Sequence, residues 1–138
     1  FGIYNPKVAV LGVNPHTVDN GVIGIEDYTI IRPAIYNLKK PGNFIFGPYS
    51  ADSFFGSKQY QNYDAIVASY HDQGLIPFKT LTFGKGVNFT AGLDRIRTSP
   101  DHGTAYEIAG KGIANPKSCE EAILTAIMIY RNRESNNF

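Results

Sequence analysis

Short runs of β-branched and apolar residues, each closed by a polar loop, constrain the fold of this chain more than any other feature. The run "KVAVLGV", from Lys7 to Val13, stops at Asn14, and the run from Ala65 to Ser69 stops at the polar cluster that follows Tyr70. Runs of this length and composition are typical of buried strands that end in loops. We therefore expect both segments in the interior of a sheet.

Other segments predict further strands and short helices. Between Ile25 and Lys40 the apolar residues recur at three- and four-residue spacing, which predicts a helix that Pro33 kinks or begins. Asp52 is expected to cap a brief helix through Phe55. Additional strands are expected at Phe44–Pro48, Gly86–Thr90 and Arg95–Ser99, and a short helix at Thr104–Ala109.

The last element gives the clearest helical signal. Ser118 and Glu121 form a capping box, and the helix after it runs to Arg131 with one face made by Ile123, Ala126, Ile127 and Tyr130. The segment Leu75–Phe83 is left unassigned because it contains Pro77. Alternating strands and helices predict a layered α/β fold, α/β/α, with at least part of its sheet parallel.

Composition limits the classes of function. The net charge is +1 over 138 residues and the basic residues are scattered, which gives no electrostatic case for binding nucleic acid or a membrane surface. No apolar run approaches the roughly 20 residues that span a bilayer, and no signal peptide is visible. The single cysteine, Cys119, excludes an intrachain disulfide and fits a cytoplasmic protein. Since Phe1 is not a Met, the chain is interpreted as the C-terminal part of a longer protein, with a processed complete domain as the alternative.

Two histidines follow predicted strands directly. His16 lies in the loop after the first strand, and His71 occupies the same kind of position after the Ala65–Ser69 strand. In parallel α/β sheets ligands gather beyond the carboxyl ends of the strands, and neutral imidazole suits divalent transition metals. The alternative for each histidine taken alone is a polar loop residue or a structural histidine with satisfied hydrogen bonds. A metal site would also need a third ligand.

Positive charge and a third histidine lie farther along the chain. Asp101, His102 and Gly103 lead into the predicted short helix, whose N-terminus would attract an anion, although a capped turn is the alternative. Arginine and lysine side chains can hold carboxylates or phosphates, and the candidates are Lys79, Lys85, Arg95 and Arg97, of which Lys85 and Arg95 are expected only to face solvent. Neither a Rossmann fingerprint nor a P-loop is present in the sequence.

Five motifs taken together resemble the C-terminal half of one enzyme family. They are "GVNPH", "SYHDQGLIPFK", "GVNFTAG", "IRTSPDHGTA" and "EIAGKG", and in this order they are similar to 4-hydroxythreonine-4-phosphate dehydrogenases from about Pro6 to about Tyr130. The segment "HGTAYEIAGKGIANP" also resembles the adenosine-binding loop of isopropylmalate and isocitrate dehydrogenases. The resemblance implies that residues 1–138 are the C-terminal portion of a two-domain dehydrogenase of that fold, incomplete at its N-terminal side.

The resemblance also implies a divided metal site and a cofactor. His16 and His71 match two of the family's three metal-binding histidines, with Zn, Mg or Co as the cation, and a homodimer would supply them from different subunits. Substrate-binding positions match Lys79, Asn88 and Arg97. The NAD or NADP site would be bordered by "AGKGIAN" and by Asp101, His102, Gly103, Thr104 and Ala105.

The implied reaction oxidises the secondary alcohol of a phosphorylated hydroxy amino acid with NAD, and the β-keto acid product then loses carbon dioxide. Lys79 and Arg97 would hold the anionic groups of the substrate, and Lys79 and Asp72 are the catalytic candidates. For Asp72, three roles stay open: orienting an imidazole, relaying a proton, or capping the loop.

Two alternative functions are also kept. The residues Thr17-Val18-Asp19 follow His16 where the family usually has a small residue, a glycine and an acid. A related dehydrogenase that oxidises a threonate or erythronate phosphate is therefore an alternative. The other is an inactive fragment that acts only in dimerisation, and this polypeptide by itself is expected to lack activity because a metal ligand and substrate contacts are missing.

Overall fold

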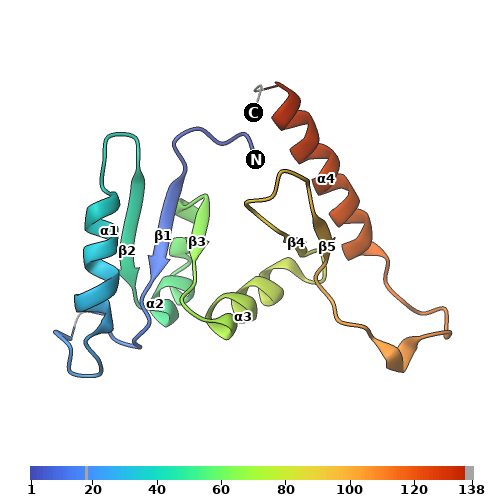
Figure 1. Cartoon of the computed structure of the whole chain (residues 1–138). Helices are drawn as coiled ribbons and strands as arrows, with labels where there is room; N and C mark the ends of the chain where they lie inside the picture. The colour runs from blue at the N-terminus through green and yellow to red at the C-terminus, as the bar shows by residue number, and fades with distance from the viewer. Residues whose placement is uncertain (18, 136–138) are drawn as a thin grey trace. The chain divides into compact units, whose positions relative to one another are not determined.

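A computed structural model describes residues 1–17 and 19–135 of the chain. The chain forms two compact units, one of residues Ile3–Pro77 and one of Phe1–Gly2 together with Phe78–Phe138. Figure 1 shows the order of the helices and strands along the chain.

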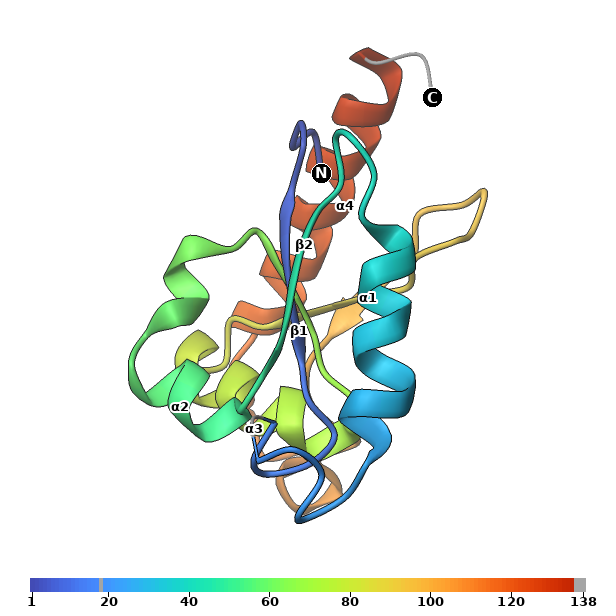
Figure 2. The same ribbon diagram turned by 90° about the vertical axis from the view of Figure 1, so that its left-hand side faces the viewer.

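The Ile3–Pro77 unit is built on a parallel sheet. Strand β1 (Lys7–Leu11) lies between β2 (Phe44–Tyr49) and β3 (Ala65–Val67) and is parallel to both. Helices α1 (Arg32–Leu38) and α2 (Ala51–Gly56) lie on opposite sides of this sheet (Figure 2). The predicted α/β class and parallel pairing are confirmed.

The core of this unit forms where β1 meets α2. Ala9, Leu11 and Phe54 are almost completely buried there, and a ring of partly buried aromatic and small side chains packs around them. Burial of a side chain the size of Leu or Phe stabilises the fold by about 1.5–3 kcal/mol. This packing fixes the carboxyl end of β1, from which the loop with His16 departs.

Helix starts in this unit differ in part from the sequence expectation. A five-residue π-helix, η1 (Asp27–Ile31), precedes α1, and α1 begins at Arg32. Pro33 therefore stands in the first turn of α1, as one of the two expectations had it, directly after the π-helical turn. Asp52 is not the cap of α2, because the helix begins at Ala51 and Asp52 already lies in its first turn.

The third strand is shorter and more exposed than expected. Strand β3 ends at Val67, and Ile66 and Val67 remain 37% and 49% exposed. Within the described parts of the chain β3 pairs with β1 alone, so one edge of this strand is open. The expectation of a buried strand is wrong here, because burial depends on neighbours that a local sequence pattern does not reveal.

His71 does not lie in a loop. It is the first residue of α3 (His71–Thr82), which includes most of the segment that the sequence left unassigned. Pro77 lies inside this helix, where proline removes one backbone donor and its ring crowds the preceding turn. A short 3₁₀-helix, η2 (Gln59–Asn62), precedes β3.

The second unit consists of a hairpin and a long helix. Strands β4 (Val87–Phe89) and β5 (Thr98–Pro100) are antiparallel, and α4 (Lys117–Ser135) packs on them. The Thr98 hydroxyl donates to the carbonyl oxygen of Ala122 over 2.9 Å, which joins β5 to α4. The strands predicted at Gly86–Thr90 and Arg95–Ser99 are confirmed in type, with shifted bounds.

The predicted capping box at the start of α4 is wrong. The helix begins one residue earlier, at Lys117, whose backbone N–H is accepted by the Asn115 side chain at 3.0 Å. Ser118 is buried inside the first turn. The buried face of α4 is made by Ser118, Ala122 and Ile129, whereas most of the predicted apolar face is exposed, namely Ile123, Ile127 and Tyr130.

The predicted helix at Thr104–Ala109 is a single 3₁₀ turn, η3 (Tyr106–Ile108). Ala105 precedes this turn in the left-handed backbone region, with φ of 48°. His102 and Gly103 therefore do not lead into a helix N-terminus, and the expected anion site of that kind is wrong, because a three-residue turn has no aligned set of free N–H groups.

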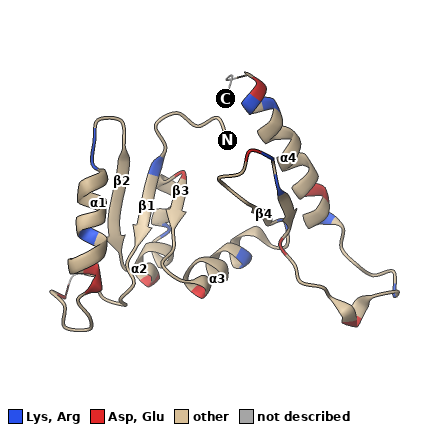
Figure 3. Ribbon diagram, in the orientation of Figure 1, with Lys and Arg blue, Asp and Glu red and all other residues tan. Residues whose placement is uncertain are grey.

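Charge is dispersed over both units. Figure 3 shows both signs of charge on α3 and on α4, in keeping with the net charge of +1. Among the residues that the structure describes, no helix combines the length and apolar character required to cross a membrane.

Candidate functional site

The loop after β1 lines a cavity of about 450 Å³ in the Ile3–Pro77 unit. His16 faces this cavity together with Asp52, from the first turn of α2, and Tyr70 and Gln73, from the region around the start of α3. The remaining lining residues are Val13, Asn14, Pro15 and Ala51. An imidazole and a carboxylate thus share one cavity at the carboxyl end of the sheet.

A buried carboxylate holds the His16 loop in place. Asp27 is 2% exposed and accepts the backbone N–H groups of Val13 at 2.9 Å and Asn14 at 3.0 Å. Gly12 permits this close approach, since a Cβ at that position would lie 3.0 Å from Asp27 Oδ2 and 2.2 Å from the Thr17 methyl carbon. The loop conformation is therefore determined by contacts made well outside the loop.

Two polar groups beside this loop carry further hydrogen bonds. The pKa of the Glu26 carboxyl lies below its ordinary value, chiefly because it accepts a backbone N–H and also because it accepts the Asn14 side-chain amide. Asp19 accepts the N–H groups of Gly21 and Val22. Its carboxylate is therefore engaged in a local turn.

Ser69 connects the ends of β1 and β3. Its hydroxyl donates to the Leu11 carbonyl oxygen at 3.0 Å, and its backbone N–H donates to the Gln73 side-chain oxygen at 2.7 Å. The segments that lead to His16 and to His71 are thereby tied to one another. This connection lies within the Ile3–Pro77 unit.

His71 and Asp72 form a solvent-facing pair at the start of α3. The His71 ring nitrogen Nδ1 lies 2.7 Å from Asp72 Oδ1, and the His71 side chain is 78% exposed. When Nδ1–H donates to the carboxylate, the Nε2 lone pair points away from it and is free to bind a cation. His71 does not line the cavity that contains His16.

The donor groups fit a divalent metal in type but not in number. Imidazole nitrogen and carboxylate oxygen are both common ligands of zinc. Across residues 1–17 and 19–135, however, no group of three His, Cys, Asp or Glu side chains is arranged to hold a metal ion. The assignment of His16 and His71 as ligands stays a prediction, and this chain by itself does not present a complete ligand set within those residues.

A second cavity, of about 500 Å³, lies in the other unit, between the η3 region and the start of α4. Four of the five residues predicted to border the cofactor line it, and Gly103 is not among the lining residues. The lining is mostly small or apolar, with Gly84, Ile108, Gly110, Gly112 and Ala114 among its members. Such a concave, largely apolar site with a few polar groups suits a small ligand.

The predicted substrate residues Asn88 and Arg97 share one face of the β4–β5 hairpin. Asn88 pairs with Ser99, and two positions along the ladder the Thr90 backbone N–H donates to the Arg97 carbonyl oxygen. Residues two apart on a strand point to the same side. The Arg97 guanidinium also donates to the Thr90 hydroxyl at 3.0 Å, which fixes its direction.

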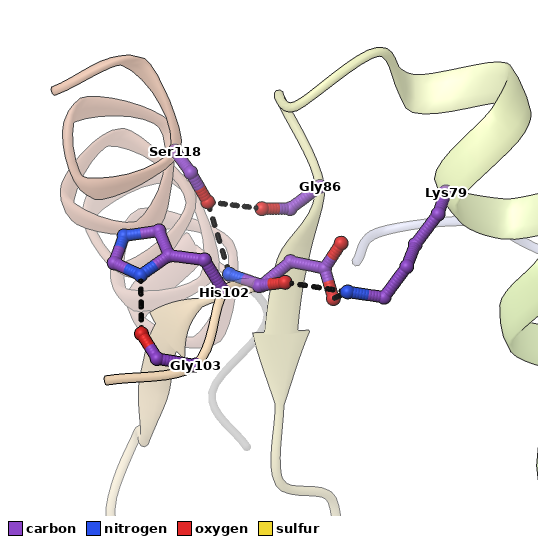
Figure 4. A network of polar contacts seen from close by, with 6 residues as sticks. Lys79, Gly86, His102, Gly103 and Ser118 are labelled. Atoms are coloured by element: carbon purple, nitrogen blue, oxygen red, sulfur yellow. Dashed lines mark hydrogen bonds and ion pairs between the residues drawn. The ribbon is translucent and has the colours of Figure 1, made fainter. Parts of the chain in front are cut away.

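Lys79 contacts one of the predicted cofactor residues. Its Nζ donates to the Asp101 carbonyl oxygen at 2.9 Å and lies 3.4 Å from the Asp101 carboxylate, as Figure 4 shows. By contrast, Arg95 forms a 4.0 Å pair with Asp94, in which both side chains are almost fully exposed. The surface interpretation of Arg95 fits this geometry.

Sequence reasoning missed several residues of these cavities. Asp52 and Ser118 were interpreted as helix caps, and Gln73 was noted only as part of the polar cluster after Tyr70. Each of them lies at or near a helix start that follows a strand or loop, which is where ligands gather in α/β folds. Their position at these helix starts was the sequence signal that could have identified them as site residues.

The chain was compared with known protein families and structures. Residues 1–126 match the family described as pyridoxal phosphate biosynthetic protein PdxA. The chain is 53% identical over 97% of its length to a 4-hydroxythreonine-4-phosphate dehydrogenase from Bacteroides thetaiotaomicron, and 54% identical over 97% to one from Sulfurihydrogenibium. A crystal structure of 4-hydroxythreonine-4-phosphate dehydrogenase from Klebsiella pneumoniae superimposes on 91% of the chain with a TM-score of 0.76 at 46% identity.

These relatives are longer than the chain. It spans 37% of the Bacteroides protein, 41% of the Sulfurihydrogenibium protein and 38% of the Klebsiella chain. The similarity therefore concerns less than half of each relative.

Proposed function

Because this chain belongs to the pyridoxal phosphate biosynthetic protein PdxA family, we propose that the complete protein carrying this sequence oxidises 4-phosphohydroxy-L-threonine with NAD. The β-keto acid formed then loses carbon dioxide, on the route to pyridoxal phosphate. The observation that carries the proposal is the match to relatives named 4-hydroxythreonine-4-phosphate dehydrogenase across nearly the whole chain.

Cationic side chains support a phosphorylated, anionic substrate. Lys79 and Arg97 each make hydrogen bonds within their own unit that fix part of the side chain. An ammonium has three donors and a guanidinium has five, so both retain donors for a phosphate or carboxylate. Together with Asn88 they would bind the substrate and orient its carbinol hydrogen toward the nicotinamide.

His16 and His71 are the residues that would hold the metal. The cavity position of His16 and the Nδ1 contact of His71 with Asp72 support this role. A divalent cation bound there supplies a Lewis acid that favours ionisation of the substrate hydroxyl. For Asp72, the contact with Nδ1 favours the role of orienting the imidazole.

The cavity beside α4 is the proposed cofactor site. Asp101, His102, Thr104 and Ala105 line a concave, mostly apolar surface. Its volume of about 500 Å³ lies within the range of small-molecule sites. NAD, or alternatively NADP, is the ligand proposed for it.

A homodimer with a shared active site completes the proposal. His16 of one subunit and His71 of another would then serve the same cation. The apolar residues exposed on α4, Ile123, Leu124, Ile127 and Met128, are suited to an interface. A cytoplasmic location is proposed as well, in keeping with the single cysteine, Cys119.

A substrate panel tests the proposed activity. The complete protein is incubated with NAD, a divalent cation and either 4-phosphohydroxy-L-threonine, 4-phosphothreonate or 4-phosphoerythronate, and NADH is followed by absorbance. The proposal predicts the highest kcat/KM with 4-phosphohydroxy-L-threonine. A clear preference for one of the other phosphates would assign the protein to the alternative dehydrogenase function.

The loop after His16 is the feature that bears on this alternative. Thr17 is buried and its hydroxyl lies 3.2 Å from the Ser50 hydroxyl. The departure at Thr17 therefore has a structural role in this chain and gives no support to the alternative substrates. Val18 lies outside the described residues.

A further inference from the structure

A network of hydrogen bonds surrounds Asp101 (Figure 4). The buried Ser118 hydroxyl donates to the Gly86 carbonyl oxygen at 2.7 Å and accepts the Asp101 backbone N–H at 3.0 Å. The Asp101 carbonyl oxygen in turn accepts Lys79 Nζ at 2.9 Å. The start of α4, the start of β4 and the end of α3 thus all determine where Asp101 lies.

The Asp101 carboxylate occupies space that glycine leaves open. A Cβ at Gly86 would lie 2.8 Å from Asp101 Oδ2, closer than real contacts allow. The Asp101 side chain is 17% exposed, whereas that of Lys79 is 53% exposed. The carboxylate is therefore held by its surroundings, and Lys79 is the more mobile partner that it can restrain.

Asp101 lines the proposed cofactor cavity, but we infer that its carboxylate is a positioning group that acts through Lys79. The inference rests on the proposed function, in which Lys79 binds the substrate. A free lysine side chain loses rotamer entropy when it binds an anion. Contacts of Nζ with the carbonyl and carboxylate of Asp101 restrict that freedom in advance and leave at least one N–H for the substrate.

This inference separates two roles for the same residue. A group that borders the cofactor affects the KM for NAD. A group that positions Lys79 affects the KM for the phosphorylated substrate instead, and its effect disappears once Lys79 has been removed. Asp101→Asn removes the charge and keeps the backbone carbonyl that accepts Lys79.

The kinetic test uses four variants of the complete protein: Asp101→Asn, Lys79→Met, the double variant, and Asp94→Asn as the matched control on an exposed pair. Asp101→Asn is expected to raise the KM for 4-phosphohydroxy-L-threonine about three- to fivefold, as loss of a partly exposed ion pair implies. The KM for NAD and the kcat should change little. In the Lys79→Met background, Asp101→Asn should have no further effect.

A second readout does not depend on catalysis. Lysines are acetylated under limiting reagent, and the rate at Lys79 is measured by peptide mass spectrometry relative to Lys111. Asp101→Asn should make Lys79 react faster, whereas Asp94→Asn should not. If the protein oxidised none of the phosphates, the proposed function would fail and this rate would still decide the inference. An unchanged labelling rate, or a raised KM for NAD that persists in the Lys79→Met background, would overturn it.

Discussion

Gln73 donates its side-chain amide N–H to the carbonyl oxygen of Gly12 over 2.6 Å, although 61 positions separate the two residues in the sequence. The oxygen of the same amide accepts the Ser69 backbone N–H at 2.7 Å. One buried side chain therefore joins the segments that lead to His16 and His71. Because both partners are backbone groups near strand ends, the contact fixes the geometry of the chain there.

Replacement of Gln73 by Leu should destabilise this end of the sheet. The change keeps similar volume but leaves the Gly12 carbonyl and the Ser69 N–H without their partner, which costs about 1–3 kcal/mol for a buried polar group. The free energy of unfolding of the complete protein in urea measures the effect. The exposed Gln61→Leu is the control and should change it by much less; equal effects of the two substitutions would show that the Gln73 contacts add no stability.

Replacement of Asp27 by Asn should destabilise the loop after β1 by a similar amount. Asp27→Asn presents an N–H₂ group to one of two backbone donors, Val13 or Asn14, so one donor loses its acceptor at a cost of about 1–3 kcal/mol. Hydrogen exchange at the amides of Val13 and Asn14 should speed up. Asp94→Asn, on an exposed side chain, should leave these rates unchanged. Normal protection of both amides in Asp27→Asn would mean that another group holds the loop.

Stability should fall at alkaline pH because of Tyr49. Burial, assisted by its hydroxyl contact with Tyr63 at 2.7 Å, raises the pKa of Tyr49 to about 12 from the ordinary value of 10.0. Above pH 10 the unfolded chain loses this proton while the folded chain retains it, so the folded state binds more protons. The resulting stability is present below about pH 10 and is lost as the pH rises toward about 12.

Urea unfolding at a series of pH values checks this. Tyr49→Phe removes the titrating hydroxyl, so the decline in the free energy of unfolding above about pH 10 should become shallower. Tyr36→Phe, at an exposed tyrosine, should retain the wild-type decline. Identical slopes for Tyr49→Phe and the wild type would place the alkaline sensitivity elsewhere.

The sequence predicted what local patterns determine. The apolar run that becomes β1 and the helical spacing before Arg131 both reflect local geometry, and both elements are present. The sequence did not predict the role of Ser118. Its hydroxyl forms hydrogen bonds with Asp101 and Gly86, which lie 17 and 32 positions away, whereas a capping box requires a bond to the helix N-terminus. Such contacts form only in the folded unit and produce no pattern of fixed spacing in the sequence.

In the candidate site, too, the sequence predicted residues that local patterns indicate and missed residues that long-range contacts bring in. His16 was identified because its motif follows a strand directly, and it does face a cavity. Asp52 shares that cavity but comes from another helix, and its sequence context suggested only a cap. The restraint of Lys79 by Asp101 could not be predicted either, because 22 positions separate the two residues in the sequence.

The most direct test of the proposed function is the effect of His71→Ala on metal-dependent NAD reduction by the complete protein with 4-phosphohydroxy-L-threonine. His71 is exposed in this chain, so its removal should leave the thermal unfolding temperature nearly unchanged. The account predicts that NADH formation is abolished and that affinity for the divalent cation falls. Turnover at the wild-type rate by the folded variant would contradict it.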